Sequence, residues 1–197
     1  MHLRGTASWE VREDFDRGLL LALYVRDAEG LTPFVVSEPA VGEPEVGALD
    51  PAPDTTTAAP SSAAVREWGI WWHRALTEPP QVPPSPPDWN GLEHLPTVRV
   101  LAERHHRKFW GWIDDRTREQ ADSRRKGDPV DLTRWVNGYE RRLGRPVRPF
   151  QLGVRLLPLA EPVGWVLAGD DVLVSTALRR DARAYEEFLT PVVDALA

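Results

Sequence analysis

The 197-residue chain contains no cysteine and only one methionine. The absence of cysteine excludes disulfides, zinc sites with thiolate ligands and a cysteine nucleophile. Long apolar runs are also missing. The strongest candidate, residues 19–25, is far too short to span a bilayer, and it follows an acidic stretch that does not resemble a signal peptide. We therefore expect a cytoplasmic protein that does not associate with membranes.

The sequence signatures of common catalytic and cofactor-binding sites are missing as well. There is no HExxH, no GxGxxG, no Walker A glycine-rich loop with lysine, and no GxSxG. Ser175 lies inside a predicted strand without a nucleophile elbow, so it is given no catalytic role. The sequence predicts no cofactor and identifies no catalytic residue.

Lysine is scarce, and arginine outnumbers it 22 to 2. This preference for arginine is typical of a high-GC bacterial genome. The net charge of -6 is spread unevenly along the chain. Residues 97–155 carry 15 basic and 8 acidic side chains, whereas residues 1–60 carry 4 and 11. A basic block of this kind is either a surface for an anionic partner or a solvated face that the acidic remainder balances. The second interpretation is the simpler one.

Two proline-rich stretches, residues 37–60 and 78–96, interrupt the chain. Each proline removes a backbone donor and restricts the residue before it, so neither stretch is expected to hold a regular element. The first has few large apolar side chains and is predicted to be a flexible insertion. The second carries Trp89, Leu92 and Leu95, which predict a loop packed against the body of the domain. A peptide ligand for an aromatic groove is the alternative for this second stretch.

Stretches at both ends of the chain predict β-structure. Residues 19–25 form the continuous apolar run of a buried strand, and residues 31–36 follow as an edge strand, giving an N-terminal hairpin. Near the C-terminus, residues 152–156 alternate in hydrophobicity. Residues 163–168 and 172–178 flank a Gly-Asp turn, which predicts a second hairpin.

Four segments have the spacing of amphipathic helices. The first is expected to have Ser62 as its N-cap and to stop before Pro79. The second, residues 98–113, is apolar over about half its circumference and is therefore expected to be central, with a polar continuation over 114–126. The third has Asp128 as its cap and Pro129 at its first position, and it ends at Gly144. The fourth spans 181–196 and is expected to kink at Pro191.

These elements predict a single α+β domain over residues 1–197. A largely antiparallel sheet of about five strands is expected to combine the N- and C-terminal parts, with about four helices packed mainly on one face.

Nine tryptophans are the most conspicuous feature of the composition. Trp71 lies away from the centre of the apolar stripe of its helix and Trp110 lies at the margin of its own, so these rings are predicted to be partly exposed. Packing of the helices is the simpler interpretation of the tryptophans, and an aromatic-lined pocket for a planar ligand is the alternative.

Cationic side chains occupy the arc of the 98–113 helix opposite its apolar stripe, namely Arg104, Arg107 and Lys108. Together with Trp71 and Trp110, they predict a surface for a protein partner, and an acidic one is favoured. Nucleic acid is disfavoured, because acids are interspersed among the arginines at Asp114, Asp115, Glu119 and Asp122. The favoured function is a non-catalytic bacterial binding or accessory protein.

The alternative function is a small enzyme, either a metal-assisted hydrolase or a nuclease. It would use His105 or His106 with carboxylates from elsewhere in the chain. Adjacent residues on a helix diverge by about 100°, so this helix cannot gather the ligands by itself, and no metal site is predicted. Glu13, Asp14 and Asp16 offer either a magnesium or acid–base site or a simple acidic turn. Convergence of three or more of the following would favour the enzyme: His73, His94, His105, His106, Asp14 and Asp16.

Overall fold

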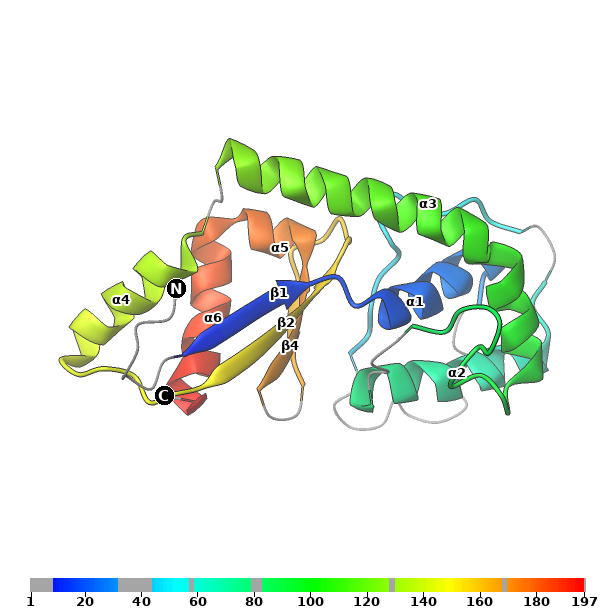
Figure 1. The fold of residues 1–197 in the computed structure, drawn as a ribbon, viewed down its shortest axis with the longest axis horizontal. Helices are drawn as coiled ribbons and strands as arrows, with labels where there is room; N and C mark the ends of the chain where they lie inside the picture. Colours follow the sequence, from blue (N-terminus) through cyan, green and yellow to red (C-terminus); the bar gives the residue numbers. More distant parts are fainter. Residues whose placement is uncertain are drawn as a thin grey trace. The chain divides into compact units, whose positions relative to one another are not determined.

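The computed structural model describes residues 9–31, 44–56, 59–78, 83–127, 130–167 and 170–196. These residues form six helices and a four-stranded mixed sheet, which confirms the α+β class (Figure 1). The chain divides into two compact units: unit 1 comprises Met1–Asp14 and Ala121–Ala197, and unit 2 comprises Phe15–Gln120. The expectation that residues 1–197 form a single domain stays a prediction.

Unit 1 contains the sheet, in the order β1-β2-β4-β3. β1 (Glu10–Asp14) pairs in parallel with β2 (Gln151–Leu157), which pairs in parallel with β4 (Asp171–Ser175). Only β3 (Gly164–Val166) is antiparallel to its neighbour, β4. The expected five strands and largely antiparallel pairing are therefore wrong, whereas the C-terminal hairpin is confirmed as β3 and β4. Four of the five residues of β1 are charged, which is why no apolar pattern revealed this edge strand.

Three helices complete unit 1: α4 (Leu132–Leu143), α5 (Thr176–Arg180) and α6 (Ala182–Leu196). The strand expected over 172–178 ends at Ser175, because the Ser175 side chain caps α5 by accepting from the amide of Leu178. Asp131 caps α4, and the expected cap at Asp128 lies outside the described residues. α6 continues through Pro191. The count of six helices corrects the expected four.

Unit 2 is built around α1 (Arg17–Glu29), and the N-terminal hairpin is wrong. Asp16 starts the helix by accepting from the amide of Leu19, and Gly30 ends it at φ 62°. Every residue from 19 to 25 is at most 4% exposed. A helix buried on all sides has the same continuous apolar run as a buried strand, so periodicity alone does not separate them. Residues 32–36 of the expected second strand lie outside the described residues.

Two predicted helices pack with α1. α2 (Ser62–Thr77) is capped by Ser61, one residue before the expected cap, and Trp68 donates from Nε1 to the carbonyl of Ala22 at 2.8 Å. α3 (Pro96–Lys126) includes both the apolar segment 98–113 and its polar continuation, and it runs from unit 2 into unit 1. In the described part of the chain, no helix is both long and apolar enough to cross a membrane.

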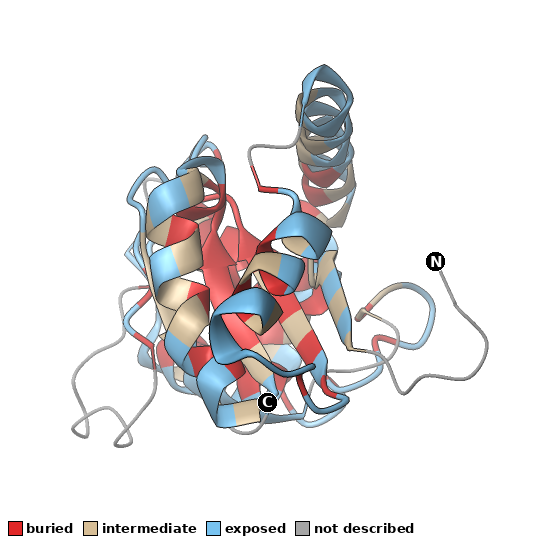
Figure 2. Cartoon of the chain, turned by 90° about the vertical axis from the view of Figure 1, so that its left-hand side faces the viewer, coloured by how far each residue is buried: buried red, intermediate tan, exposed pale blue. Residues whose placement is uncertain are grey.

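The proline-rich stretches make specific contacts where they are described. In the first, Val46 and Leu49 are buried, and the Arg26 guanidinium donates to the carbonyls of Val46 and Gly47. Residues 44–56 therefore have a few apolar anchors, while 37–43 and 57–58 lie outside the described residues. The flexible insertion over 37–60 stays a prediction. In the second stretch Trp89, Leu92 and Leu95 are buried. Figure 2 shows that buried residues gather in the strands and along the inner sides of the helices.

Candidate functional site

The predicted cationic residues lie on the exposed side of α3, within unit 2. Arg104 and Lys108 have side chains that are 54% and 65% exposed, and Arg107 is exposed as well. Val100, one turn before Arg104, is an exposed apolar residue at 54%. Residues three, four and seven apart share one side of a helix. These four residues therefore lie on one side of α3, and we call them the α3 basic face: Val100, Arg104, Arg107 and Lys108. The exposed acid Glu103 lies beside them and pairs with Arg99 at 3.0 Å.

A buried carboxylate holds Arg104 in place. Glu29, at the end of α1, accepts from Arg104 Nη1 at 2.8 Å and lies 2.6 Å from His105 Nε2 through the same oxygen, Oε1. Burial of Glu29 acts to raise its pKa, but the hydrogen bonds and charges of His105 and Arg104 outweigh burial and lower the pKa below its ordinary value. Glu29 is therefore ionised at neutral pH and fixes the guanidinium of Arg104 at the edge of the α3 basic face.

The other two cations are less constrained. Lys108 Nζ lies 3.6 Å from Asp54 Oδ2, and both side chains are mostly exposed, so this pair contributes little stability. Arg107 has neither a hydrogen bond nor an ion pair with any residue that the structure describes. No described residue therefore competes with an external anion for its guanidinium.

The two predicted tryptophans differ in their surroundings. Trp71 is only 4% exposed, so the expectation that it is partly exposed is wrong. Ala64 and Ala75, which are buried on the same side of α2, extend the buried arc as far as Trp71. Trp110 is partly exposed and lies one turn after Arg107, at the border of the α3 basic face.

A histidine and an arginine hold the ring of Trp110. Its Nε1 donates to Nε2 of His106 at 2.7 Å, and the Arg17 guanidinium lies 5.1 Å from the ring centroid. The Trp89 ring meets His106 edge-on at 5.3 Å. Burial lowers the pKa of His106 from its usual 6.5. The hydrogen bond itself requires an unprotonated Nε2, so this contact depends on the neutral imidazole.

We expect acid to weaken this contact. Because the folded chain binds the His106 proton less readily than the unfolded chain, its contribution to stability is complete above about pH 6.5 and is lost as the pH falls through the lowered pKa. Between about pH 7.5 and 5, the thermal midpoint of the native chain should therefore fall more than that of His106→Gln, whose amide does not titrate in this range. His73→Gln, at an exposed position, is the matched control. Equal pH dependence of native chain and His106→Gln would contradict this assignment.

The residues proposed for the enzyme do not assemble into a metal site. Among the described residues, no group of three or more His, Asp or Glu is arranged to hold a metal ion. His73 and His94 are exposed, His105 contacts Glu29, and the Asp16 side chain caps α1. The described geometry thus supplies no support for the enzyme hypothesis.

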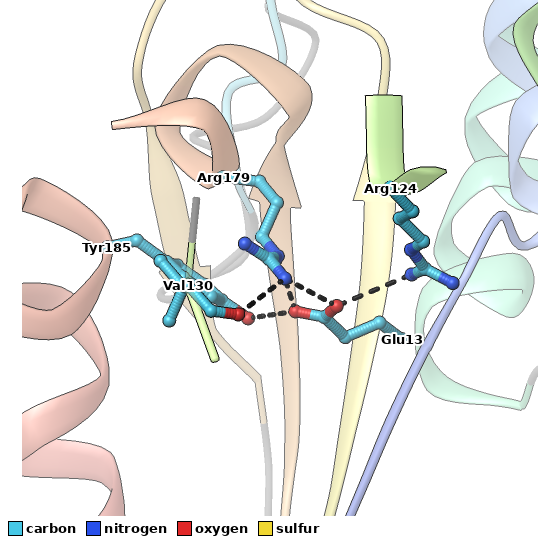
Figure 3. Close-up of polar contacts among 5 residues, drawn as sticks. All are labelled: Glu13, Arg124, Val130, Arg179 and Tyr185. Atoms are coloured by element: carbon cyan, nitrogen blue, oxygen red, sulfur yellow. Dashed lines mark hydrogen bonds and ion pairs between the residues drawn. The ribbon is translucent and has the colours of Figure 1, made fainter. Parts of the chain in front are cut away.

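A buried polar cluster in unit 1 centres on Glu13 of β1 (Figure 3). Its Oε1 accepts from Arg179 Nε at 2.7 Å and from the Tyr185 hydroxyl at 2.6 Å. Its Oε2 accepts from Arg179 Nη2 at 3.1 Å and from Arg124 Nη2 at 3.4 Å. Arg179 Nη2 also donates to the carbonyl of Val130 at 3.4 Å. The side chains of Glu13 and Arg179 are only 8% and 4% exposed.

This cluster explains Glu13 without invoking a metal or an acid–base reaction. Between them, the two carboxylate oxygens accept hydrogen bonds from Arg179, Tyr185 and Arg124. The Arg179 guanidinium also stacks 4.9 Å from the centroid of the Tyr185 ring. Glu13 thereby joins β1 to α5, α6 and the end of α3. We interpret the cluster as a structural connection within unit 1.

No protein-family model matches the sequence, and neither a curated protein nor a solved structure matches it.

Proposed function

We propose that the chain is a non-catalytic bacterial binding or accessory protein that recognises a protein partner through the α3 basic face. The observation that carries the proposal is the placement of an exposed apolar residue, Val100, beside three exposed cations on one side of one helix. Arginine and aromatic residues are enriched in protein interfaces, and Trp110 borders this face. Trp71, predicted as part of the same surface, is excluded by its burial.

The charge of the surroundings favours an acidic partner. Residues 15–120, which make up unit 2, carry 10 basic and 16 acidic side chains, so the α3 basic face is a local exception in an acidic unit. A partner with a negative patch is attracted to this face, whereas a partner with a positive patch is attracted to the remainder of the unit. The favoured partner therefore presents carboxylates around an apolar residue that contacts Val100.

Charge reversal at two positions tests the proposal. The double variant Arg107→Glu/Lys108→Glu is expected to lose a partner that co-purifies with the native tagged chain from the cells that produce it. Arg104 is left unchanged, because its hydrogen bond to Glu29 would make a loss of binding hard to separate from a loss of stability. Mass spectrometry of the captured proteins is the measurement.

Arg66→Glu is the matched control, because Arg66 is an exposed arginine on α2 in the same unit. A protein retained by Arg66→Glu and lost from the double variant supports the α3 basic face as the binding surface. If both reversals retain the same proteins in the same amounts, the α3 basic face is not the binding surface and the proposal fails.

A further inference from the structure

A second basic surface lies on unit 1, separate from the α3 basic face. Five arginines in α4 and the segment that follows it are all exposed. We call them the α4 arginine surface: Arg134, Arg141, Arg142, Arg145 and Arg148. Residues 130–150 contain only two acids, Asp131 and Glu140. The surface therefore carries a strong local excess of positive charge.

Both acids are engaged in holding the backbone. Asp131 Oδ1 accepts from the amide of Arg134 at the start of α4, and Glu140 Oε1 accepts from the amide of Val147 at 3.0 Å. Val147 is buried, which anchors the segment that carries Arg145 and Arg148. The arginines thus project from a backbone that these hydrogen bonds fix in place.

The outward side of α4 is free of carboxylates. Its residues, spaced three, four and seven apart, are Arg134, Asn137, Gly138 and Arg141. An added Cβ at Gly138 would meet nothing closer than 3.8 Å, from Arg141 Nη2. The outward side of α4 is therefore polar and has small side chains at its centre. Arg134 and Arg141 flank this centre and are about 10 Å apart along the helix axis, from the rise per residue of an α-helix.

This surface lacks most of the interspersed acids that disfavour nucleic acid on α3. Those acids belong to α3, where Asp115 pairs with Arg118 and Asp122 with Arg125. On α4 Arg134 lies 3.9 Å from Asp131 at the start of the helix, whereas Arg141 and Arg142 have no ion pair with a carboxylate that the structure describes.

We propose that the α4 arginine surface binds the phosphate backbone of duplex DNA without sequence preference. Interfaces with DNA are more polar and much more positive than protein–protein interfaces, and the guanidinium fork binds phosphate oxygens in pairs. The exposed large apolar residue here is Leu143, at 40%, which by itself is too small to form the apolar centre of a protein interface.

Duplex DNA fits this surface better than other nucleic acids. Single strands are held by stacking on exposed aromatic rings, but Trp135 and Tyr139 of α4 are buried, at 7% and 5% exposure. An exposed helix fits the wide major groove of B-DNA, whereas the major groove of an RNA duplex is deep and narrow. The α4 arginine surface shares no residue with the α3 basic face.

The test is fluorescence anisotropy of the full chain with a labelled random-sequence duplex of about 30 base pairs at several salt concentrations. If four of the five arginines contact phosphates, the logarithm of affinity is expected to fall with the logarithm of salt with a slope of about -3 to -4. Arg141→Gln/Arg145→Gln should reduce the slope by roughly 2 and weaken binding roughly tenfold or more at 0.1 M salt. Arg183→Gln on α6, where the native side chain is 89% exposed, should behave as the native chain does.

Other probes give the outcomes that would overturn the proposal. These are a single-stranded oligonucleotide, a duplex RNA of equal length, and a labelled poly-glutamate peptide. Tighter binding of any of them than of duplex DNA contradicts the proposal, and preference for the peptide would assign the surface to an acidic protein. Absence of DNA binding at low salt, or equal weakening by Arg183→Gln, contradicts it too. Circular dichroism of each variant establishes that the fold is retained.

Discussion

Replacing Phe109 with alanine is expected to lower the free energy of unfolding by about 3–5 kcal/mol. Phe109 is fully buried on the apolar side of α3. Its ring meets Tyr24 edge-on at 5.7 Å and stacks with Trp112 at 6.2 Å. These large rings are held by other contacts, including the bond from Trp112 Nε1 to the carbonyl of Pro51, so they close only part of the cavity that alanine leaves. Equilibrium unfolding in urea measures the effect.

Val100→Ala is the matched control on the same helix. Val100 is 54% exposed, so its truncation should change stability by no more than about 0.5 kcal/mol. An unfolding midpoint that Phe109→Ala leaves unchanged would show that α3 does not organise the core of unit 2.

Replacing Glu13 with glutamine is expected to lower the free energy of unfolding by about 3–5 kcal/mol, because it removes the charge opposite a buried arginine. Arg179 is 3% exposed and Tyr185 is fully buried, so water does not replace the lost interaction. The volume of the side chain is preserved, which separates the loss of charge from the formation of a cavity. Chemical denaturation measures the cost.

A double variant identifies the cause of this loss. Replacing both partners with apolar residues, as in Glu13→Leu/Arg179→Met, should restore much of the stability, because no buried charge is then left uncompensated. Glu10→Gln changes an exposed carboxylate on the same strand and should stay within about 0.5 kcal/mol of the native chain. Equal costs for Glu10→Gln and Glu13→Gln would contradict a structural role for the cluster.

Helices with both an apolar stripe and a polar side were predictable from the sequence. The spacing of Trp135, Val136 and Tyr139 predicted α4, and Gly144 ended it as expected at φ 69°. α1 was not predictable in this way, because a helix without a polar side gives no 3.6-residue period. β1 was missed for the opposite reason, since it is short, charged and at the edge of the sheet.

The candidate sites also differ in how far the sequence predicts them. The phase of the 98–113 helix places Arg104, Arg107 and Lys108 on its exposed side, and the structure agrees. The partners of Glu13 had no local signal, because Arg179 and Tyr185 lie 166 and 172 positions away in the sequence. Pairing over such a distance depends on the sheet topology, in which β1 joins β2 in parallel across more than half of the chain.

The affinity of the captured partner for the native chain and for Arg107→Glu/Lys108→Glu, measured by calorimetry at two salt concentrations, tests the central claim most directly. The account predicts that the double reversal weakens binding by about tenfold or more, equivalent to about 1.4 kcal/mol, and reduces its dependence on salt. Arg66→Glu should leave both quantities unchanged. Equal affinities of the native chain and the double variant at both salt concentrations would contradict recognition through the α3 basic face.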